Sequence, residues 1–346
     1  MDRTSTHHYT ACGIPHSEAL GDQPVASPDN PALLICITVS ERIRQGRVME
    51  QDHVHASVVN AFTMNGAGGN PAGVVLDAGR LTRAQKQSVA AKMGLSETAF
   101  VSPSATADFK LEFFTPTRQI AHCGHATIAT FSLLAQQGQL RGQTSSKETI
   151  DGRREIMLDG DRVYMQQLAP KFTPLGETSV TLPQVLGALG LTPDELLSGA
   201  APLVVNTGNA FLVIGVNSNA VLAGLQPDME KIGEISDALQ LIGVYAFAPA
   251  VQNPNHHADA RMFAPLYGIP EEAATGMAAG PLGAYLHQIL GVQANPILIG
   301  QGAHMTPPSP SELEVHLSVA PGVITAVTVG GRATKRESRD FRLSEL

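Results

Sequence analysis

The chain has 346 residues, of which 43% are hydrophobic and 16% are charged, an ordinary soluble balance with room for two cored domains. Its formal net charge is −8 without any cluster of Lys or Arg, which argues against a nucleic-acid or anionic-membrane partner. Three cysteines, Cys12, Cys36 and Cys123, are too few and too scattered for a disulfide framework or a four-cysteine zinc site, so we expect a reducing, cytoplasmic setting.

The first 54 residues differ from the rest of the chain. They are polar and show no sustained hydrophobic period until a strand-like run begins at 58–62. The apolar run at 33–37 is short and lacks the basic flank of a signal peptide, so secretion is not expected. We predict an N-terminal extension over 1–54, either a disordered tail or the result of a start codon assigned too early, because Met49 lies just before the strand.

A glycine-rich loop occupies 66–71 and is followed by a second strand-like run at 72–76. A phosphate-binding loop would need a Lys-Ser or Lys-Thr pair and a helix after the glycines, and the sequence supplies neither. The pattern therefore predicts a hairpin.

A helix is predicted over 82–93. Thr82 is the N-cap, Gln85 completes a capping box three residues later, and Gly94 ends the helix. A strand pattern follows over 95–101, and its alternation places Glu97 on the same face as Ala99 and Val101. Glu97 can lie on an outward face, be paired inside the protein, or act as a catalytic acid and base.

Two long segments carry no Asp, Glu, Lys or Arg, 119–140 and 273–311, and each follows a Phe-x-Pro sequence. A helix without charge on any face is typical of a helix buried all round. Glycines, prolines and a His interrupt the second segment, so we predict a buried helix plus a strand there and no membrane span. Strands at 203–208 and 211–216 precede it, so the second half repeats the plan of the first.

Both uncharged segments begin with small residues and glycine. The free N–H groups and the dipole of a buried helix N-terminus favour anions, so two such ends facing each other would bind a carboxylate. His125 lies in the opening turn of the first segment and is either a satisfied polar residue or a functional one. Glu271 and Glu272 lie before the second segment, as dipole partners or as site residues. His256 and His257 lack a third ligand at suitable spacing, so we predict no metal site.

Several motifs together resemble the PhzF phenazine-biosynthesis family, in order from about residue 56 to the C-terminus. They are Gly69-Asn70-Pro71-Ala72, Ser96-Glu97-Thr98-Ala99-Phe100, Phe114-Thr115-Pro116, Cys123-Gly124-His125-Ala126-Thr127 and Arg261-Met262-Phe263-Ala264-Pro265 with Glu272-Ala273-Ala274-Thr275-Gly276. The resemblance implies an α+β fold of the diaminopimelate-epimerase type, with two similar domains. In each, a barrel-like sheet surrounds a central helix, and the active site lies in the cleft between them.

The resemblance also implies an isomerase that works by proton transfer without cofactor or metal. Glu97 corresponds to the acid and base, with His125 and Glu272 as further catalytic residues. The substrate-binding residues it implies are Asn70, Gly124, Thr275, Gly276 and Met277. The expected substrate is a small carboxylate, a dihydro-hydroxyanthranilate or a related secondary metabolite.

Two departures separate this chain from the family pattern, and a further feature separates it from relatives that use two catalytic thiols. The family pattern usually has Asp at the position of Glu272 and Ser at that of Met277. The relatives that use two catalytic thiols need one from each half of the chain, and the last cysteine here is Cys123. A two-thiol racemase mechanism is therefore excluded, and Cys123 is interpreted as a small buried residue.

We therefore predict a first domain over 55–170, completed by a C-terminal strand at 333–346, and a second domain over 171–332. A homodimer is the expected assembly. Two other functions stay open: a non-catalytic binding or interaction protein of this family, and an epimerase or lyase that uses a single Glu on another small acid.

Overall fold

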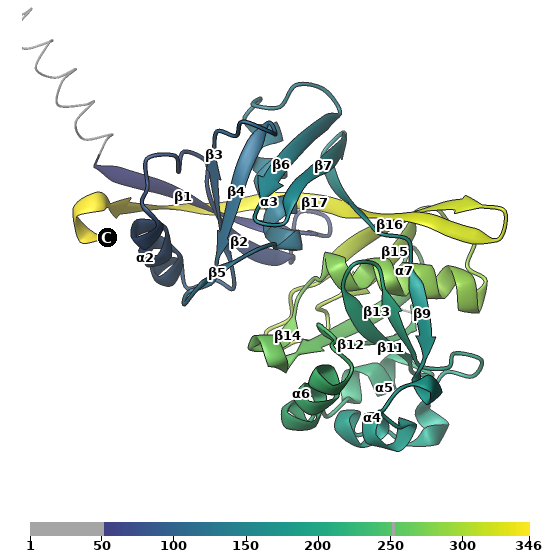
Figure 1. Ribbon diagram of the computed structural model, residues 1–346. Coiled ribbons are helices and arrows are strands. Elements are labelled where there is room, and N and C mark those ends of the chain that lie inside the picture. The colour runs from purple at the N-terminus through teal and green to yellow at the C-terminus, as the bar shows by residue number, and fades with distance from the viewer. Residues whose placement is uncertain (1–51, 251–252) are drawn as a thin grey trace, which may run out of the picture. The chain divides into compact units, whose positions relative to one another are not determined.

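The computed structural model describes residues 52–250 and 253–346 (Figure 1). Nearly all of the predicted N-terminal extension thus lies outside the described residues. The helices of the described part are α2 (Arg83–Met93), α3 (Gly124–Gln136), α4 (Leu182–Leu189), α5 (Asn219–Gly224), α6 (Met229–Ala238) and α7 (Gly276–Leu290). Short 3-10 turns lie at Leu175–Glu177, Pro193–Glu195, Pro265–Tyr267 and Leu343–Glu345.

Strands alternate with these helices along the whole described chain. In the first half they are β1 (His53–Ala61), β2 (Asn70–Val75), β3 (Thr98–Ser102), β4 (Phe109–Phe114), β5 (Gln119–Ile120), β6 (Thr144–Thr149), β7 (Gly152–Asp159) and β8 (Arg162–Gln167). In the second half they are β9 (Lys171–Pro174), β10 (Leu203–Asn206), β11 (Ala210–Gly215), β12 (Gly243–Pro249), β13 (Ala258–Ala264), β14 (Ile269–Glu272), β15 (Ile297–Gln301), β16 (Ser311–Ala320) and β17 (Val323–Arg342).

The first half closes into a barrel. Following the pairings from strand to strand gives the circuit β17, β1, β2, β3, β4, β6, β7, β8 and back to β17, which is an 8-strand barrel. The pairs β2–β3 and β4–β6 are parallel, and the others in the circuit are antiparallel. Closure satisfies the backbone groups that an edge strand would leave unpaired.

The second half is built from a similar curved sheet. Its strands pair in the order β9, β10, β11, β12, β13, β15, β16 and β17, with β14 added beside β13. The architecture is therefore the predicted α+β fold of two barrel-like halves.

The long strand β17 belongs to both halves, as its path in Figure 1 shows. Its first part pairs with β16 and β8, and the part from Ala333 to Arg342 pairs with β1. β1 begins at His53, so the last two residues of the predicted extension lie in this strand. The reason is the pairing of His53 with Arg342 and of Val54 with Phe341, which leaves Val54 only 2% exposed.

Local sequence signals predicted several elements correctly. Thr82 and Gln85 form the predicted capping box, and Gly94 ends α2 in the left-handed conformation. The glycine-rich loop joins β1 and β2 in an antiparallel hairpin, as predicted. The first charge-free segment supplies α3, and the second supplies α7 and β15.

Each half is centred on one of the uncharged helices. Every residue of α3 from Gly124 to Leu134 is buried, against β17, β2, β1 and β8. In α7 the residues from Ala278 to Leu286 are likewise buried, against β16, β17 and β11. Packing on every face explains why neither helix carries a charged side chain. No helix in the described part of the chain has both the length and the apolar character needed to cross a membrane.

A buried imidazole in the second half makes stability depend on pH. His256 Nδ1 lies 3.2 Å from a carboxylate oxygen of Asp259, and Nε2 lies 3.3 Å from one of Glu312. Burial alone lowers the pKa of His256, but its bonds to the two carboxylates outweigh burial and raise the pKa from 6.5 to about 9. The folded state thus binds a proton that the unfolded state has released above pH 6.5.

We expect the stability that protonated His256 contributes to be complete below about pH 6.5 and to be lost as the pH rises through about 9. Thermal unfolding of the wild type and of His256→Gln across this interval measures it. The melting temperature of the wild type should fall toward that of the variant as pH rises. Parallel curves for the two proteins would show that His256 does not bind this proton.

Candidate active site

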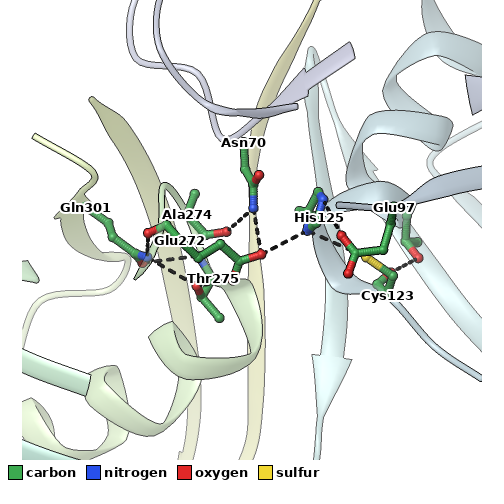
Figure 2. A network of polar contacts seen from close by, with 9 residues as sticks. Asn70, Glu97, Cys123, His125, Glu272, Ala274, Thr275 and Gln301 are labelled. Carbon is green, nitrogen blue, oxygen red and sulfur yellow. Dashed lines mark hydrogen bonds and ion pairs between the residues drawn. The ribbon is translucent and has the colours of Figure 1, made fainter. Parts of the chain in front are cut away.

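A cavity of about 990 Å³ lies between the starts of α3 and α7 and is lined by residues of both halves. Its walls include Glu97, His125 and Glu272. This size suits a small-molecule ligand. Figure 2 shows the three side chains converging from separate parts of the chain.

Glu97 is held just before β3. The backbone N–H of Gly73 donates to the Glu97 carbonyl at 3.0 Å, which fixes this point against β2. Ala99 and Val101 point into the core around α3, so the predicted alternation places Glu97 correctly on the inner side. The predicted strand 95–101 is too long at its start, because the ladder with β2 begins at Thr98. The outward-facing alternative for Glu97 is wrong, since its side chain is only 10% exposed.

His125 lies between two carboxylates. Its Nε2 is 3.3 Å from Glu97 Oε2, and its Nδ1 is 3.4 Å from Glu272 Oε1. The His125 side chain is 5% exposed. Glu97 Oε2 and His125 Nε2 are both buried and lack a hydrogen-bond partner within the described part of the chain. A ligand bound in the cavity could supply the hydrogen bonds that these two neighbouring polar atoms lack.

Glu272, by contrast, is well anchored. The Asn70 amide donates to Glu272 Oε1 at 2.8 Å and to the Ala274 carbonyl at 2.9 Å, and the Thr275 hydroxyl donates to Glu272 Oε2 (Figure 2). Burial raises the pKa of Glu272, and the nearby Glu97 adds to this, while His125, Thr275 and Asn70 oppose it. Glu272 therefore holds a proton more readily than an exposed Glu.

Gln301 supports this arrangement from β15. Its side-chain oxygen accepts from the Thr275 backbone N–H at 3.1 Å and from the Tyr245 hydroxyl at 2.8 Å. Its amide nitrogen donates to the Glu272 carbonyl at 2.7 Å. Gln301 thus fixes the turn that leads from Glu272 into α7. Gln301 and Tyr245 were not predicted as site residues, because nothing local in the sequence relates them to a turn far away along the chain.

The neighbouring Glu271 has a different place. Both of its carboxylate oxygens accept from Arg261, at 2.8 and 2.9 Å, so Glu271 is held in a two-point ion pair. It is not among the residues that line the cavity.

The two helix starts approach each other across the cavity. A Cβ atom built on Gly124 would lie 3.6 Å from Met277 Cγ and 3.6 Å from Met165 Cε. Met277 therefore covers the first turn of α3, and the Asn209 amide donates to its sulfur at 3.3 Å. The first N–H groups of a helix have no partner inside the helix, so those of Gly124, Gly276 and Met277 are available to an anion.

Comparison with known proteins decides the family. A family model described as "Phenazine biosynthesis-like protein" (PhzC-PhzF) matches residues 59–339. The chain belongs to the PhzF family. A relative from Deinococcus radiodurans named as an uncharacterized isomerase is 39% identical over 81% of this chain and 92% of its own length. The trans-2,3-dihydro-3-hydroxyanthranilate isomerase of Pseudomonas chlororaphis is 30% identical, covering 67% of this chain and 79% of that enzyme.

Solved structures agree on the fold. A PhzF-family protein of Bacillus anthracis superposes with a TM-score of 0.75 at 24% identity, covering 84% of this chain and 99% of that one. A hydroxyproline epimerase of Agrobacterium vitis superposes with a TM-score of 0.53 at 13% identity, covering 84% and 91%. The curated PhzF relatives include several named as isomerases, so the chain is a member of an isomerase family.

One cluster at this PhzF site has the spacing of metal ligands. Ligand atoms of Glu97, Cys123 and His125 all lie within 4.8 Å of one another. Burial, together with the charges of Glu97 and Glu272, raises the pKa of the Cys123 thiol well above its ordinary value. A thiol must lose its proton to bind a metal, and this environment opposes that loss. The absence of a metal stays a prediction.

A buried lysine was also missed. Lys147, on β6, is 0% exposed and donates to the Thr127 hydroxyl on α3 at 2.6 Å. In the sequence it lies among polar residues, a pattern typical of an exposed strand. Its burial follows from the closure of the barrel, which brings β6 against the start of α3.

Proposed function

We propose that the protein is a cofactor-independent isomerase that moves a proton between two carbons of a small carboxylate, with Glu97 as the acid and base. The observation that carries this proposal is the buried Glu97 Oε2, which has no hydrogen-bond partner in the described chain and lies 3.3 Å from His125 Nε2. A carboxylate oxygen that no protein group bonds is free to meet a C–H group of a bound substrate.

The other predicted site residues bind the substrate and position it for proton transfer by Glu97. His125 orients the substrate and lies between Glu97 and Glu272, so a proton can be shared along this row. Asn70 and Thr275 hold Glu272, which binds a polar group of the substrate. The N–H groups of Gly124, Gly276 and Met277 bind the substrate carboxylate and stabilise the negative charge that forms when the C–H proton leaves.

The cavity and one relative support the proposed substrate class. The Pseudomonas chlororaphis relative is named for trans-2,3-dihydro-3-hydroxyanthranilate, a small cyclic amino acid. We propose a small acid with an acidic C–H for this chain. Met277 lies over the α3 start with a flexible apolar side chain, which favours a substrate whose outline differs from that of the phenazine precursor. The cytoplasmic setting and the homodimer remain predictions.

Proton NMR in deuterated buffer tests the reaction class. The purified protein is incubated with trans-2,3-dihydro-3-hydroxyanthranilate and with a panel of small amino and hydroxy acids. We expect one substrate to move a double bond and to take up deuterium at a new carbon. Inverted configuration without a moved bond would indicate an epimerase, and loss of water would indicate a lyase. Each of those two results would contradict the proposed isomerase, as would ligand binding without any reaction across the panel.

A further inference from the structure

One wall of the cavity is basic. His122, Lys147 and Arg154 all line it, and they come from the turn before α3, from β6 and from β7. Lys147 and Arg154 are directly paired across the β6–β7 ladder. Arg118 lines the same cavity from the approach to β5. None of these residues belongs to the group of Glu97, His125 and Glu272 described above.

The Lys147 ammonium group has no carboxylate partner within the described residues. Its Nζ donates to Thr127 at 2.6 Å, lies 3.2 Å from His122 Nδ1 and 3.8 Å from Met165 Sδ, and stands 5.4 Å from the Phe113 ring centre. Burial lowers the pKa of Lys147 to about 7, with a further lowering by Arg154, while Cys123 and Asp151 oppose it. A buried amine that is only partly protonated at neutral pH is a costly feature, and a bound anion would remove the cost.

His122 connects Lys147 to the cavity. Burial, Lys147 and Arg154 lower the pKa of His122 to about 3, so its imidazole is neutral. With Lys147 as the donor to Nδ1, the ring proton lies on Nε2. This nitrogen has no hydrogen bond within the described chain and is not fully buried. It therefore faces the cavity that His122 lines.

The exposed members of the wall are also unpaired. Within residues 52–250 and 253–346, neither Arg118 nor Arg154 makes an ion pair, whereas the neighbouring Arg153 pairs with Glu155 at 3.4 Å. Asp151 and Glu155 are the carboxylates that line this side of the cavity. Arg118 and Arg154 are thus available to an anion in the cavity.

We propose that His122, Lys147 and Arg154 bind a second anionic group of the substrate, a carboxylate or a phosphate, in addition to the carboxylate bound by the helix N-termini. The substrate is therefore a dianion. This inference rests on the proposed function, because it places the second anion in the cavity of Glu97. His122 and Arg154 contact the anion, whereas Lys147 acts through His122 and through its charge, which is strong in a poorly solvated interior.

Calorimetric titration with matched acids tests the wall. Butyrate and pentanoate provide one anionic group, succinate and glutarate provide two carboxylates, and 3-phosphonopropionate provides a carboxylate and a phosphonate. We expect each two-anion acid to bind the wild type at least about tenfold more tightly than the one-anion acid of equal length. Tighter binding of 3-phosphonopropionate than of succinate identifies the second anionic group as a phosphate. Tighter binding of succinate identifies it as a carboxylate.

Two variants locate the effect. Lys147→Met and Arg154→Gln should each reduce the preference for two anions to about twofold or less. Arg83→Gln removes the same charge from the exposed surface of α2 and should keep the full preference. Arg154 is exposed, so its variant remains informative if Lys147→Met fails to fold. Equal binding of both classes by the wild type, or a preference that survives in Arg154→Gln, would overturn the proposal.

Proton uptake provides a readout that a purely structural lysine would not change. Binding measured near pH 8 in two buffers of different ionisation enthalpy should show a fraction of a proton taken up, since the anion favours the charged form of Lys147. Lys147→Met should lose this uptake. The proposed isomerase is judged separately by deuterium incorporation. Exchange without a two-anion preference refutes the basic wall alone, and the preference without exchange refutes the reaction alone.

Discussion

Replacement of Glu97 by Gln is expected to lower kcat by about 10²–10⁴-fold, the range for loss of a general acid or base. Gln has nearly the same shape but cannot take a proton from carbon. The fold should not suffer, because Glu97 Oε2 is a buried atom without a hydrogen-bond partner in the described chain, and a neutral amide costs less to bury than a carboxylate. The melting temperature should therefore stay the same or rise.

The matched control is Glu234→Gln, which makes the same chemical change at an exposed position of α6. Steady-state rates and ligand affinities of both variants are compared with those of the wild type on a substrate found by the NMR panel. We expect Glu97→Gln to keep its affinity and Glu234→Gln to keep both affinity and rate. A Glu97→Gln enzyme with more than about a tenth of the wild-type kcat would not fit general acid and base catalysis by this residue.

Replacement of Arg261 by Met should destabilise the fold by about 3–5 kcal/mol, the usual result of breaking a buried ion pair from one side. The Arg261 side chain is 9% exposed and that of Glu271 is 16% exposed. The guanidinium also lies 5.0 Å from the Phe263 ring centre. Its remaining nitrogen donates to three carbonyls near the end of α5, those of Leu222, Ala223 and Leu225.

Urea unfolding measures this loss as a free energy. The double variant Arg261→Met, Glu271→Met is the decisive comparison, because it removes both charges and leaves no unpaired carboxylate. It should recover a substantial part of the stability lost in the single variant. If the loss of stability in the double variant equals the sum of the losses in the two single variants, the ion pair contributes nothing beyond its separate members. Because Glu271 adjoins Glu272, the single variant should also weaken ligand binding.

Local chemistry explains why parts of the fold could be predicted. The capping box of Thr82 and Gln85 and the stop at Gly94 act within one or two helical turns, so the sequence contains all of the relevant information. The charge-free segments predict burial because a helix without charged side chains can pack on every face. In the structure every face of α3 and α7 is covered. Alternation in a strand placed Glu97 on the inner side, although the start of β3 depends on its pairing with β2.

The contacts that build the site are long-range and were not predictable in this way. Asn70 reaches Glu272 across more than half of the chain, and Gln301 reaches back to Thr275 from β15. The motifs named Asn70 and Thr275 as site residues without specifying these bonds. Lys147 shows the limit most clearly. Its neighbours in sequence are polar, and only barrel closure buries it beside Thr127.

In the proposed mechanism Glu97 takes a proton from one carbon of the substrate, exchanges it with solvent and delivers a proton to another carbon. The most direct test of this mechanism is deuterium incorporation at the product carbon, measured by NMR for the wild type and for Glu97→Gln after both proteins have been shown to bind the same ligand. We expect incorporation at the new carbon with the wild type and none with the variant. Equal incorporation by the two proteins would contradict this claim and assign the proton transfer to another group.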